Sequence, residues 1–270
     1  MSTEPSGWRD VWSAGALYEP YMGRWSRLVA KELLNRLAIP PEKDWLEVGC
    51  GTGSLSHIIV AHGLPRSLKC VDSSADFLAC AKNIGGAGIV FELGNAQALP
   101  SGSDKFDVVV SGLVLNFVPQ PQQAVMEMAR VVRPGGLVAA YVWDYAEKME
   151  LIRHFWDCAV ALDPAALEVD EGRRFPLCCP APLAELFRNA GLRQVQVDSI
   201  DIFTRFRDFD DYWSPFLGGQ GPAPGYVVSL SEERRAALRE RIRASLPIAE
   251  DGSITLMARA WFVRGDRPGD

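Results

Sequence analysis

Three glycines at alternate positions, Gly49, Gly51 and Gly53, follow directly on the apolar run 45–48. A helical pattern begins just after them, so the sequence predicts a strand, a tight turn and a helix N-terminus. Glycines let a ligand approach the backbone closely, and the free N–H groups at a helix start favour a carboxylate or a phosphate. Dinucleotide-binding turns read G-x-G-x-x-G, whereas this stretch, counted from Glu47, reads E-x-G-x-G-x-G. It predicts a ligand site, and the alternative is a glycine-rich turn that holds no ligand.

An acidic residue ends the next predicted strand, 67–72. This residue, Asp72, lies about 20 residues beyond the glycines, where a carboxylate can accept hydrogen bonds from both ribose hydroxyls of a nucleoside. Ser73 and Ser74 can cap the helix that follows, which has Phe77 among its apolar positions. A surface Asp without a ligand is the alternative, but the glycine turn before it favours the nucleoside site.

The motif formed by Glu47 and the three glycines resembles motif I of the class I S-adenosylmethionine (SAM)-dependent methyltransferases. After the fourth predicted strand, 104–111, residues 111–118 read Ser-Gly-Leu-Val-Leu-Asn-Phe-Val. Enzymes that methylate nucleic-acid bases at exocyclic nitrogen commonly have Asn/Asp-Pro-Pro-Tyr at this point. The chain is instead similar to methyltransferase type 11 proteins, akin to the quinone-biosynthesis C-methyltransferases. The resemblance covers about residues 18–145, and it implies SAM as cofactor, S-adenosylhomocysteine (SAH) as product and a small-molecule acceptor.

The resemblance also implies which residues contact the cofactor. Related methyltransferases usually carry Gly-Asp-Ala after the third strand, where the Asp accepts from the adenine amino group; Asn95 stands in that place here, and its amide oxygen can still accept. Similar enzymes lay an N-terminal segment over bound SAM, so Arg24 is expected to pair with the methionine carboxylate and tyrosine faces to meet the sulfonium. The expected cofactor-binding residues are Tyr18, Tyr21, Met22, Arg24, Glu47, Gly49, Cys50, Gly51, Thr52, Gly53, Asp72, Ser73, Phe77, Gly94, Asn95, Ala96, Gln97, Ser111, Gly112, Leu113, Asn116 and Phe117.

No residue stands out as a catalytic base. Methyl transfer from a sulfonium is an in-line displacement, to which an enzyme contributes mainly orientation and the exclusion of water. An oxygen or nitrogen acceptor that needs deprotonation would have His154, Asp144 or Tyr141 as candidate bases, although a lone His on a helix is more often structural. The six cysteines form no C-x-x-C pair, and His57 and His62 are five residues apart, so no metal site is expected.

Alternating strand and helix patterns must position these motifs. Single helices between the strands predict a doubly wound α/β fold with right-handed crossovers. In the fold that the resemblance implies, seven strands have the order 3-2-1-4-5-7-6 with strand 7 antiparallel. The helix over about 121–132 is expected to end at the Arg-Pro-Gly-Gly turn, 133–136. The expected strands are 45–48, 67–72, 88–93, 104–111, 137–144, 194–204 and 254–263.

The whole chain, 1–270, is expected to form one domain. Its N-terminal segment, 1–38, would cover the cofactor, and an α-helical cap insertion, 145–180, would lie over the carboxyl ends of the strands. A second lid segment, 205–230, contains the aromatic and Gly/Pro-rich stretch 209–226, which predicts a loop that can close over a pocket. The alternative for this stretch is a well-packed excursion.

Composition restricts the partners and the location. The formal net charge of −6 gives no basic field for nucleic acid or an anionic membrane. No apolar run approaches the roughly 20 residues of a membrane span, and the start of the chain lacks the layout of a signal peptide. These features favour a cytoplasmic protein with reduced thiols and leave the oligomeric state open. Two other functions remain: an NAD-dependent oxidoreductase, disfavoured by the glycine spacing, and a non-catalytic SAM-binding regulatory protein, which would carry the same motifs.

Overall fold

The computed structural model describes residues 19–82, 88–219 and 221–269. A seven-stranded sheet with the order β3-β2-β1-β4-β5-β7-β6 runs through this part of the chain. Strand β7 pairs antiparallel with both β5 and β6, and the other pairs are parallel, as the resemblance implies. The strands are β1 (Asp44–Val48), β2 (Ser67–Asp72), β3 (Ile89–Leu93), β4 (Phe106–Gly112), β5 (Val132–Trp143), β6 (Arg193–Phe206) and β7 (Ile254–Asp266).

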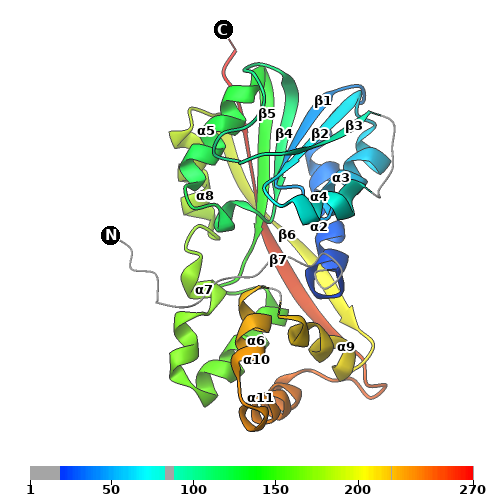
Figure 1. Ribbon diagram of the computed structural model, residues 1–270, viewed down its shortest axis with the longest axis vertical. Coiled ribbons are helices and arrows are strands. Elements are labelled where there is room, and N and C mark those ends of the chain that lie inside the picture. Colours follow the sequence, from blue (N-terminus) through cyan, green and yellow to red (C-terminus); the bar gives the residue numbers. More distant parts are fainter. Residues whose placement is uncertain (1–18, 83–87, 220, 270) are drawn as a thin grey trace.

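Helices cover both faces of this sheet (Figure 1). One face carries α2 (Arg24–Leu37), α3 (Ser54–Ile58) and α4 (Ala75–Ala81), and the other carries α5 (Pro121–Val131) and α8 (Pro180–Asn189). The central strands are apolar along their length because both of their faces are buried. Val109 and Val110 of β4, for example, have no exposed surface. The carboxyl edge of the sheet, where the ligand is expected, is therefore built on central strands whose faces are covered by helices.

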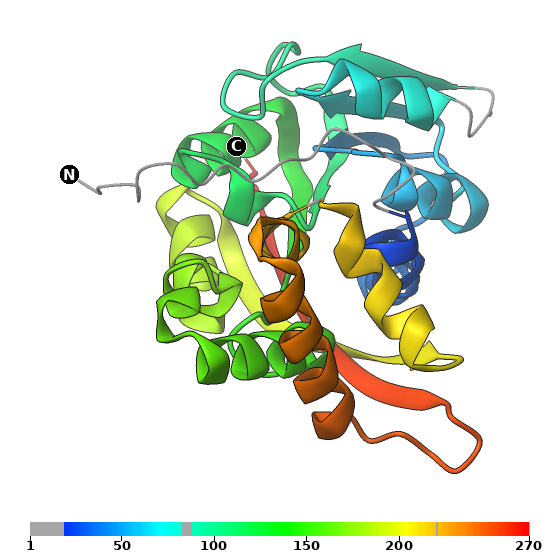
Figure 2. The ribbon, with the colours of Figure 1, turned by 60° about the horizontal axis from the view of Figure 1, so that its bottom comes forward.

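Strands β6 and β7 continue past the ends of their neighbours, and a group of helices packs around this extension (Figure 1). The helices are α6 (Glu150–Leu162), α7 (Glu171–Arg174), α9 (Phe209–Trp213), α10 (Pro222–Ser229) and α11 (Glu232–Ser245). Figure 2 shows α10 and α11 between α6 and α9. Aromatic rings hold the group together: Phe155 of α6 stacks on Phe216 with centroids 4.8 Å apart.

Segment 209–226 is not the loop that its Gly/Pro content predicts. It forms α9, a 3-10 turn over Ser214–Gly218 and the first half of α10. Asp208 caps α9 by accepting from the Asp211 N–H, and Pro222 occupies the first turn of α10, where a missing N–H costs nothing. Here the proline and the cap start helices, and the burial of aromatic side chains outweighs the loop tendency of the Gly/Pro-rich sequence.

The end of α5 also differs from the prediction. The helix stops at Val131, and Val132 is already extended and begins β5. The Arg-Pro-Gly-Gly turn therefore lies inside an irregular first part of β5, where the register with β4 shifts between Phe106 and Val108. The turn positions the strand rather than capping the helix. Among the described residues, no helix combines the length and apolar character that crossing a bilayer requires.

Candidate functional site

The glycine turn after β1 has a backbone shape that side chains disfavour. Gly49 and Gly51 have φ values of 76° and 53°, in the left-handed region. A Cβ atom on Gly49 would lie 2.5 Å from Val114 Cγ2, so this glycine also allows the β1 and β4 turns to touch. A Cβ on Gly51 would meet nothing within 4 Å, because this residue faces open space. The turn thus presents bare backbone to the space above it.

Asp72, at the end of β2, is tied to that turn. Its Oδ2 accepts from the Gly51 N–H at 2.8 Å, and its Oδ1 accepts from the Ser74 N–H at 2.8 Å. Ser74 in turn caps α4, as predicted, by accepting from the Phe77 N–H at 3.3 Å. These bonds fix the carboxylate between the two turns, with the acidic group at the carboxyl edge of the sheet.

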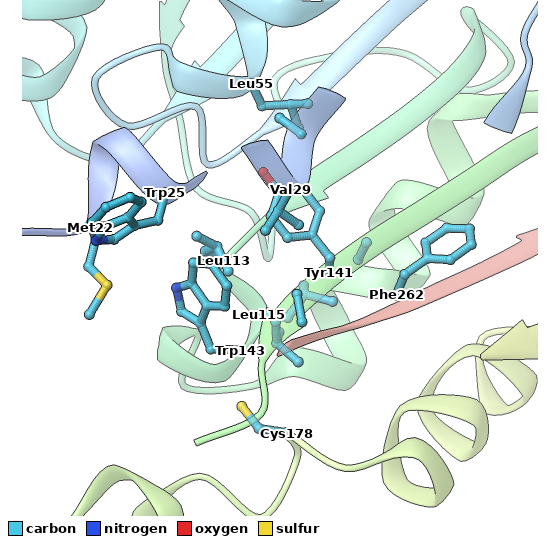
Figure 3. Packing of buried hydrophobic residues seen from close by; sticks show 14 of the residues in the cluster. Met22, Trp25, Val29, Leu55, Leu113, Leu115, Tyr141, Trp143, Cys178 and Phe262 are labelled. Carbon is cyan, nitrogen blue, oxygen red and sulfur yellow. The ribbon is translucent and has the colours of Figure 1, made fainter. Parts of the chain in front are cut away.

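A cavity of about 250 Å³ opens above the glycine turn, near the lower end of the roughly 300–1,000 Å³ usual for ligand sites. It extends from the β1 and β2 turns toward the helices around β6 and β7. Figure 3 shows Leu113 and Trp143 projecting from the ends of β4 and β5, and Met22 from the turn before α2. The residues that line the cavity are Tyr21, Met22, Ser26, Glu47, Gly49, Cys50, Gly51, Thr52, Ser54, Leu55, Asp72, Ser73, Ser74, Phe77, Gly112, Leu113, Val114, Phe117, Tyr141, Trp143, Tyr145, Glu171 and Pro222.

Most of the predicted cofactor residues line this cavity, but eight described ones do not. Those at the cavity come from the turn before α2, the glycine motif, the end of β2, the start of α4, and the end of β4 with the turn that follows it. Tyr18 lies outside the described residues. The residues placed elsewhere are Arg24, Gly53, Gly94, Asn95, Ala96, Gln97, Ser111 and Asn116.

Arg24 is committed to another part of the fold. Its Nη1 donates to Asp211 Oδ1 at 3.0 Å, and its guanidinium lies over the rings of Trp25 and Phe206, 4.3 and 4.9 Å from their centroids. The pair joins the start of α2 to α9. Arg24 does not line the cavity and its charge is paired with Asp211, so its contact with a cofactor carboxylate has no support here and stays a prediction.

Asn95 is likewise used internally. Its Oδ1, the atom expected to accept from an adenine amino group, accepts from the Gln97 N–H at 2.9 Å and closes the turn after β3. Short Asn side chains make this local turn readily. The structure gives no support for the adenine contact, and direct contact of Asn95 with the cofactor stays a prediction.

Of the three candidate bases, the structure brings only Tyr141 to the cavity. His154 lies on α6 away from it, and burial lowers the pKa of its imidazole. Asp144 also lies outside the lining; burial raises the pKa of its carboxyl, whose Oδ1 accepts from the Glu147 N–H at 3.1 Å. His154 and Asp144 therefore do not line this cavity, and a role as base for either one stays a prediction.

Glu47, in the glycine motif, is a buried carboxyl at the floor of the site. Only 1% of its surface is exposed, and it accepts a short hydrogen bond from the Ser56 hydroxyl. Burial, reinforced by the neighbouring Cys70 and Asp72, raises the pKa of Glu47 well above its usual value. Cys70 Sγ lies 3.7 Å from Glu47 Oε2, and the pKa of Cys50 is raised by its contact with Cys70 and by burial. Burial therefore favours the protonated form of the Glu47 carboxyl.

Sequence reasoning missed the residues that close the far end of the cavity. Trp143 ends β5 and Tyr145 follows it, Glu171 comes from α7, and Pro222 begins α10. An N-cap signal at Asp170 is present in the sequence, and Asp170 does accept from the Gly172 N–H. That signal predicts a helix start, but only the tertiary fold brings its first residue to the site.

Comparison with known proteins agrees with this geometry. Residues 46–140 match the family model described as a methyltransferase domain. A demethylmenaquinone methyltransferase of Bacillus licheniformis is 30% identical over 173 residues, which cover 58% of this chain and 74% of that protein. A malonyl-[acyl-carrier protein] O-methyltransferase of Herminiimonas arsenicoxydans is 25% identical over 261 residues, covering 94% of this chain and 92% of that protein.

Other matches are more local or concern the fold alone. The match to an uncharacterized Mycobacterium tuberculosis protein, 31% identical, covers only 41% of that protein's length and 41% of this chain. The crystal structure of a putative methyltransferase from Bacillus halodurans superposes with a TM-score of 0.59 and 14% identity, covering 88% of this chain and 98% of that one. The sheet order, the glycine turn joined to Asp72 and the identity to a relative covered over most of its length lead to one conclusion: the chain belongs to the class I SAM-dependent methyltransferases.

Proposed function

We propose that this protein transfers the methyl group of SAM, the cofactor of its family, to a small-molecule acceptor. The observation that carries the proposal is that the glycine turn and Asp72 line the same cavity, which aromatic side chains also line. The names of the relatives support methyl transfer, and they differ in acceptor: one is named for demethylmenaquinone and the other for malonyl-[acyl-carrier protein].

The described residues fit this cofactor. Gly51 leaves bare backbone open to the cavity, where a methionyl or adenosyl group can approach. Asp72 keeps acceptor capacity beyond the two N–H groups that it binds, because a carboxylate has about four acceptor positions, and would hold the ribose hydroxyls. When bound, the cofactor supplies an electrophilic methyl group on a sulfonium.

The remaining lining residues would orient the acceptor and keep water out. Leu113, Phe117 and Trp143 form an apolar wall between the glycine turn and the far end of the cavity. Removing water and holding the reacting atoms in line lower the barrier of a displacement without an acid or a base. Burial of Glu47 favours its uncharged form, which limits the negative charge beside Asp72.

Calorimetric titration with SAM, SAH and NAD, followed by turnover of methyl-labelled SAM against metabolite fractions, tests the proposal. SAM and SAH are expected to bind, and Asp72→Asn to weaken SAH by about tenfold or more because a charge-assisted hydrogen bond is lost. Asp76→Asn, on the exposed side of α4, is the matched control and should leave affinity unchanged. Binding of NAD alone would overturn the proposal, and SAM binding without any labelled product would leave a binding protein.

A further inference from the structure

Among the residues that the structure describes, the charged ones that line the cavity are all acidic. Glu47, Asp72 and Glu171 are present, and the described lining contains no Lys, Arg or His. Burial favours the uncharged form of Glu47, and Asp72 is held by the glycine turn. Glu171 lies at the end of the cavity away from the cofactor motif. An acceptor would meet this carboxylate rather than a basic residue.

Glu171 is held rigidly in that position. Only 2% of its surface is exposed, and its carboxylate accepts a short hydrogen bond from the Trp156 indole N–H. The preceding residue, Asp170, pairs with Arg153 at 2.7 Å, and the same guanidinium donates to the Tyr145 carbonyl at 3.0 Å. This pair anchors the start of α7 to α6 and to the segment after β5. The carboxylate of Glu171 is thus built into the site, not left on a mobile surface.

Aromatic rings make up the wall beside it. Tyr21, Phe117, Trp143 and Tyr145 all line the cavity. Phe175, just after α7, bridges the wall, with its centroid 5.0 Å from that of Phe117 and 5.6 Å from that of Tyr145. Ring faces and a desolvated carboxylate both attract positive charge and repel negative charge.

We propose that the methyl acceptor is an amine and that Glu171, with the aromatic wall, stabilises the positive charge that forms on its nitrogen. The inference rests on the proposed methyl transfer. The nitrogen lone pair forms the new N–C bond as the S–C bond breaks, and the S–C electron pair stays on sulfur to give SAH. Positive charge therefore moves from sulfur to nitrogen, toward Glu171. An acceptor carrying a carboxylate would instead be repelled there.

Binding of a charged probe and its uncharged isostere tests this assignment on SAH-loaded protein. Choline and 3,3-dimethylbutanol have the same shape and differ by one charge. Choline is expected to bind about tenfold or more tightly, and Glu171→Gln to remove that advantage while leaving the alcohol and SAH unaffected. Glu168→Gln is the control, because Glu168 lies on the same insertion but is 60% exposed and pairs with Arg173. The wild-type comparison alone is decisive if the Glu171 variant does not fold.

Equal affinity for the two probes, or no choline binding, would overturn the amine assignment. So would an equal loss for both probes in the Glu171 variant. Turnover adds an independent readout: label from SAM should enter amines and not matched alcohols, phenols or carboxylic acids. Label in an oxygen acceptor alone refutes the amine and keeps methyl transfer, whereas failure of SAH to bind refutes the proposed function itself.

Discussion

Replacing Gly49 and Gly51 separately by Ala distinguishes the two tasks of the glycine turn. At Gly49 the new methyl group would lie 2.5 Å from Val114 Cγ2, and the backbone keeps φ at 76°. At Gly51 the backbone is also left-handed, with φ at 53°, but the methyl group points into open space. The first substitution therefore disturbs the fold, and the second disturbs the space that a cofactor would occupy.

The magnitudes follow from these two geometries. Forcing an L-residue into the left-handed region costs about 1–2 kcal/mol, and overfilling a packed contact costs about 1–3 kcal/mol more. Gly49→Ala should therefore lower the free energy of unfolding by about 2–5 kcal/mol, and Gly51→Ala by only about 1–2 kcal/mol. In contrast, Gly51→Ala should weaken SAH about tenfold or more, because a buried ligand cannot yield to the extra methyl group.

Urea unfolding and calorimetric titration with SAH measure the two effects on the same samples. Val114→Ala supplies the internal check. It removes the two methyl groups nearest to the added Cβ and leaves Val114 Cβ 3.0 Å away, so the added cost of Gly49→Ala should fall toward the backbone strain, a coupling that a double-mutant cycle detects. A Gly49→Ala protein within about 0.5 kcal/mol of wild type would refute the packing argument. Unchanged SAH affinity in Gly51→Ala would refute the position assigned to the cofactor.

Three other substitutions test neighbouring parts of the account. Arg24→Ala should cost roughly 1–2 kcal/mol of unfolding free energy through its lost ion pair and ring contacts, with unchanged SAH affinity. A large loss of SAH affinity would show that Arg24 does contact the cofactor. Asp211→Asn, which removes the charge of its partner, is the control. The pKa of Glu47 in the folded state lies above its unfolded value near 4.5. Protonated Glu47 therefore contributes fully to the free energy of unfolding below about pH 4.5, and this contribution is lost as pH rises toward the folded-state pKa. Glu47→Gln should therefore flatten the fall of unfolding free energy between pH 5 and 8, by up to about 1.4 kcal/mol per pH unit, and parallel wild-type and variant profiles would contradict this. Arg153→Ala should cost about 3 kcal/mol by leaving Asp170 buried without its partner, and an unchanged unfolding midpoint would show that the pair does not anchor α7.

Local signals predicted the parts of the fold that depend on local chemistry. The apolar run before Gly49 and the acid at position 72 sit where a βαβ unit requires them, and Ser74 caps α4 as its side chain allows. The strand order, which was expected from the resemblance that these motifs carry, is confirmed as well. Strand and helix bounds differ by a few residues, most clearly at Val132, where β5 begins directly after α5.

The rest depends on partners distant in the sequence. Nothing near Arg24 in the chain indicates that Asp211, 187 residues away, neutralises it. Asn95 satisfies its own turn, a local use that competed with the ligand role expected for it. Glu171 had no motif at all, because its importance comes from the cavity to which the insertion brings it. Residues of the cofactor motif are therefore easier to predict than those of the acceptor end.

A crystal structure of the protein with SAH tests the central claim most directly. We expect the ribose hydroxyls to lie against Asp72, the amino-acid end near Gly51, and the sulfur on the side of the aromatic wall that ends at Glu171. Adenosine bound with its sugar elsewhere, or a cavity that stays empty at saturating SAH, would contradict it.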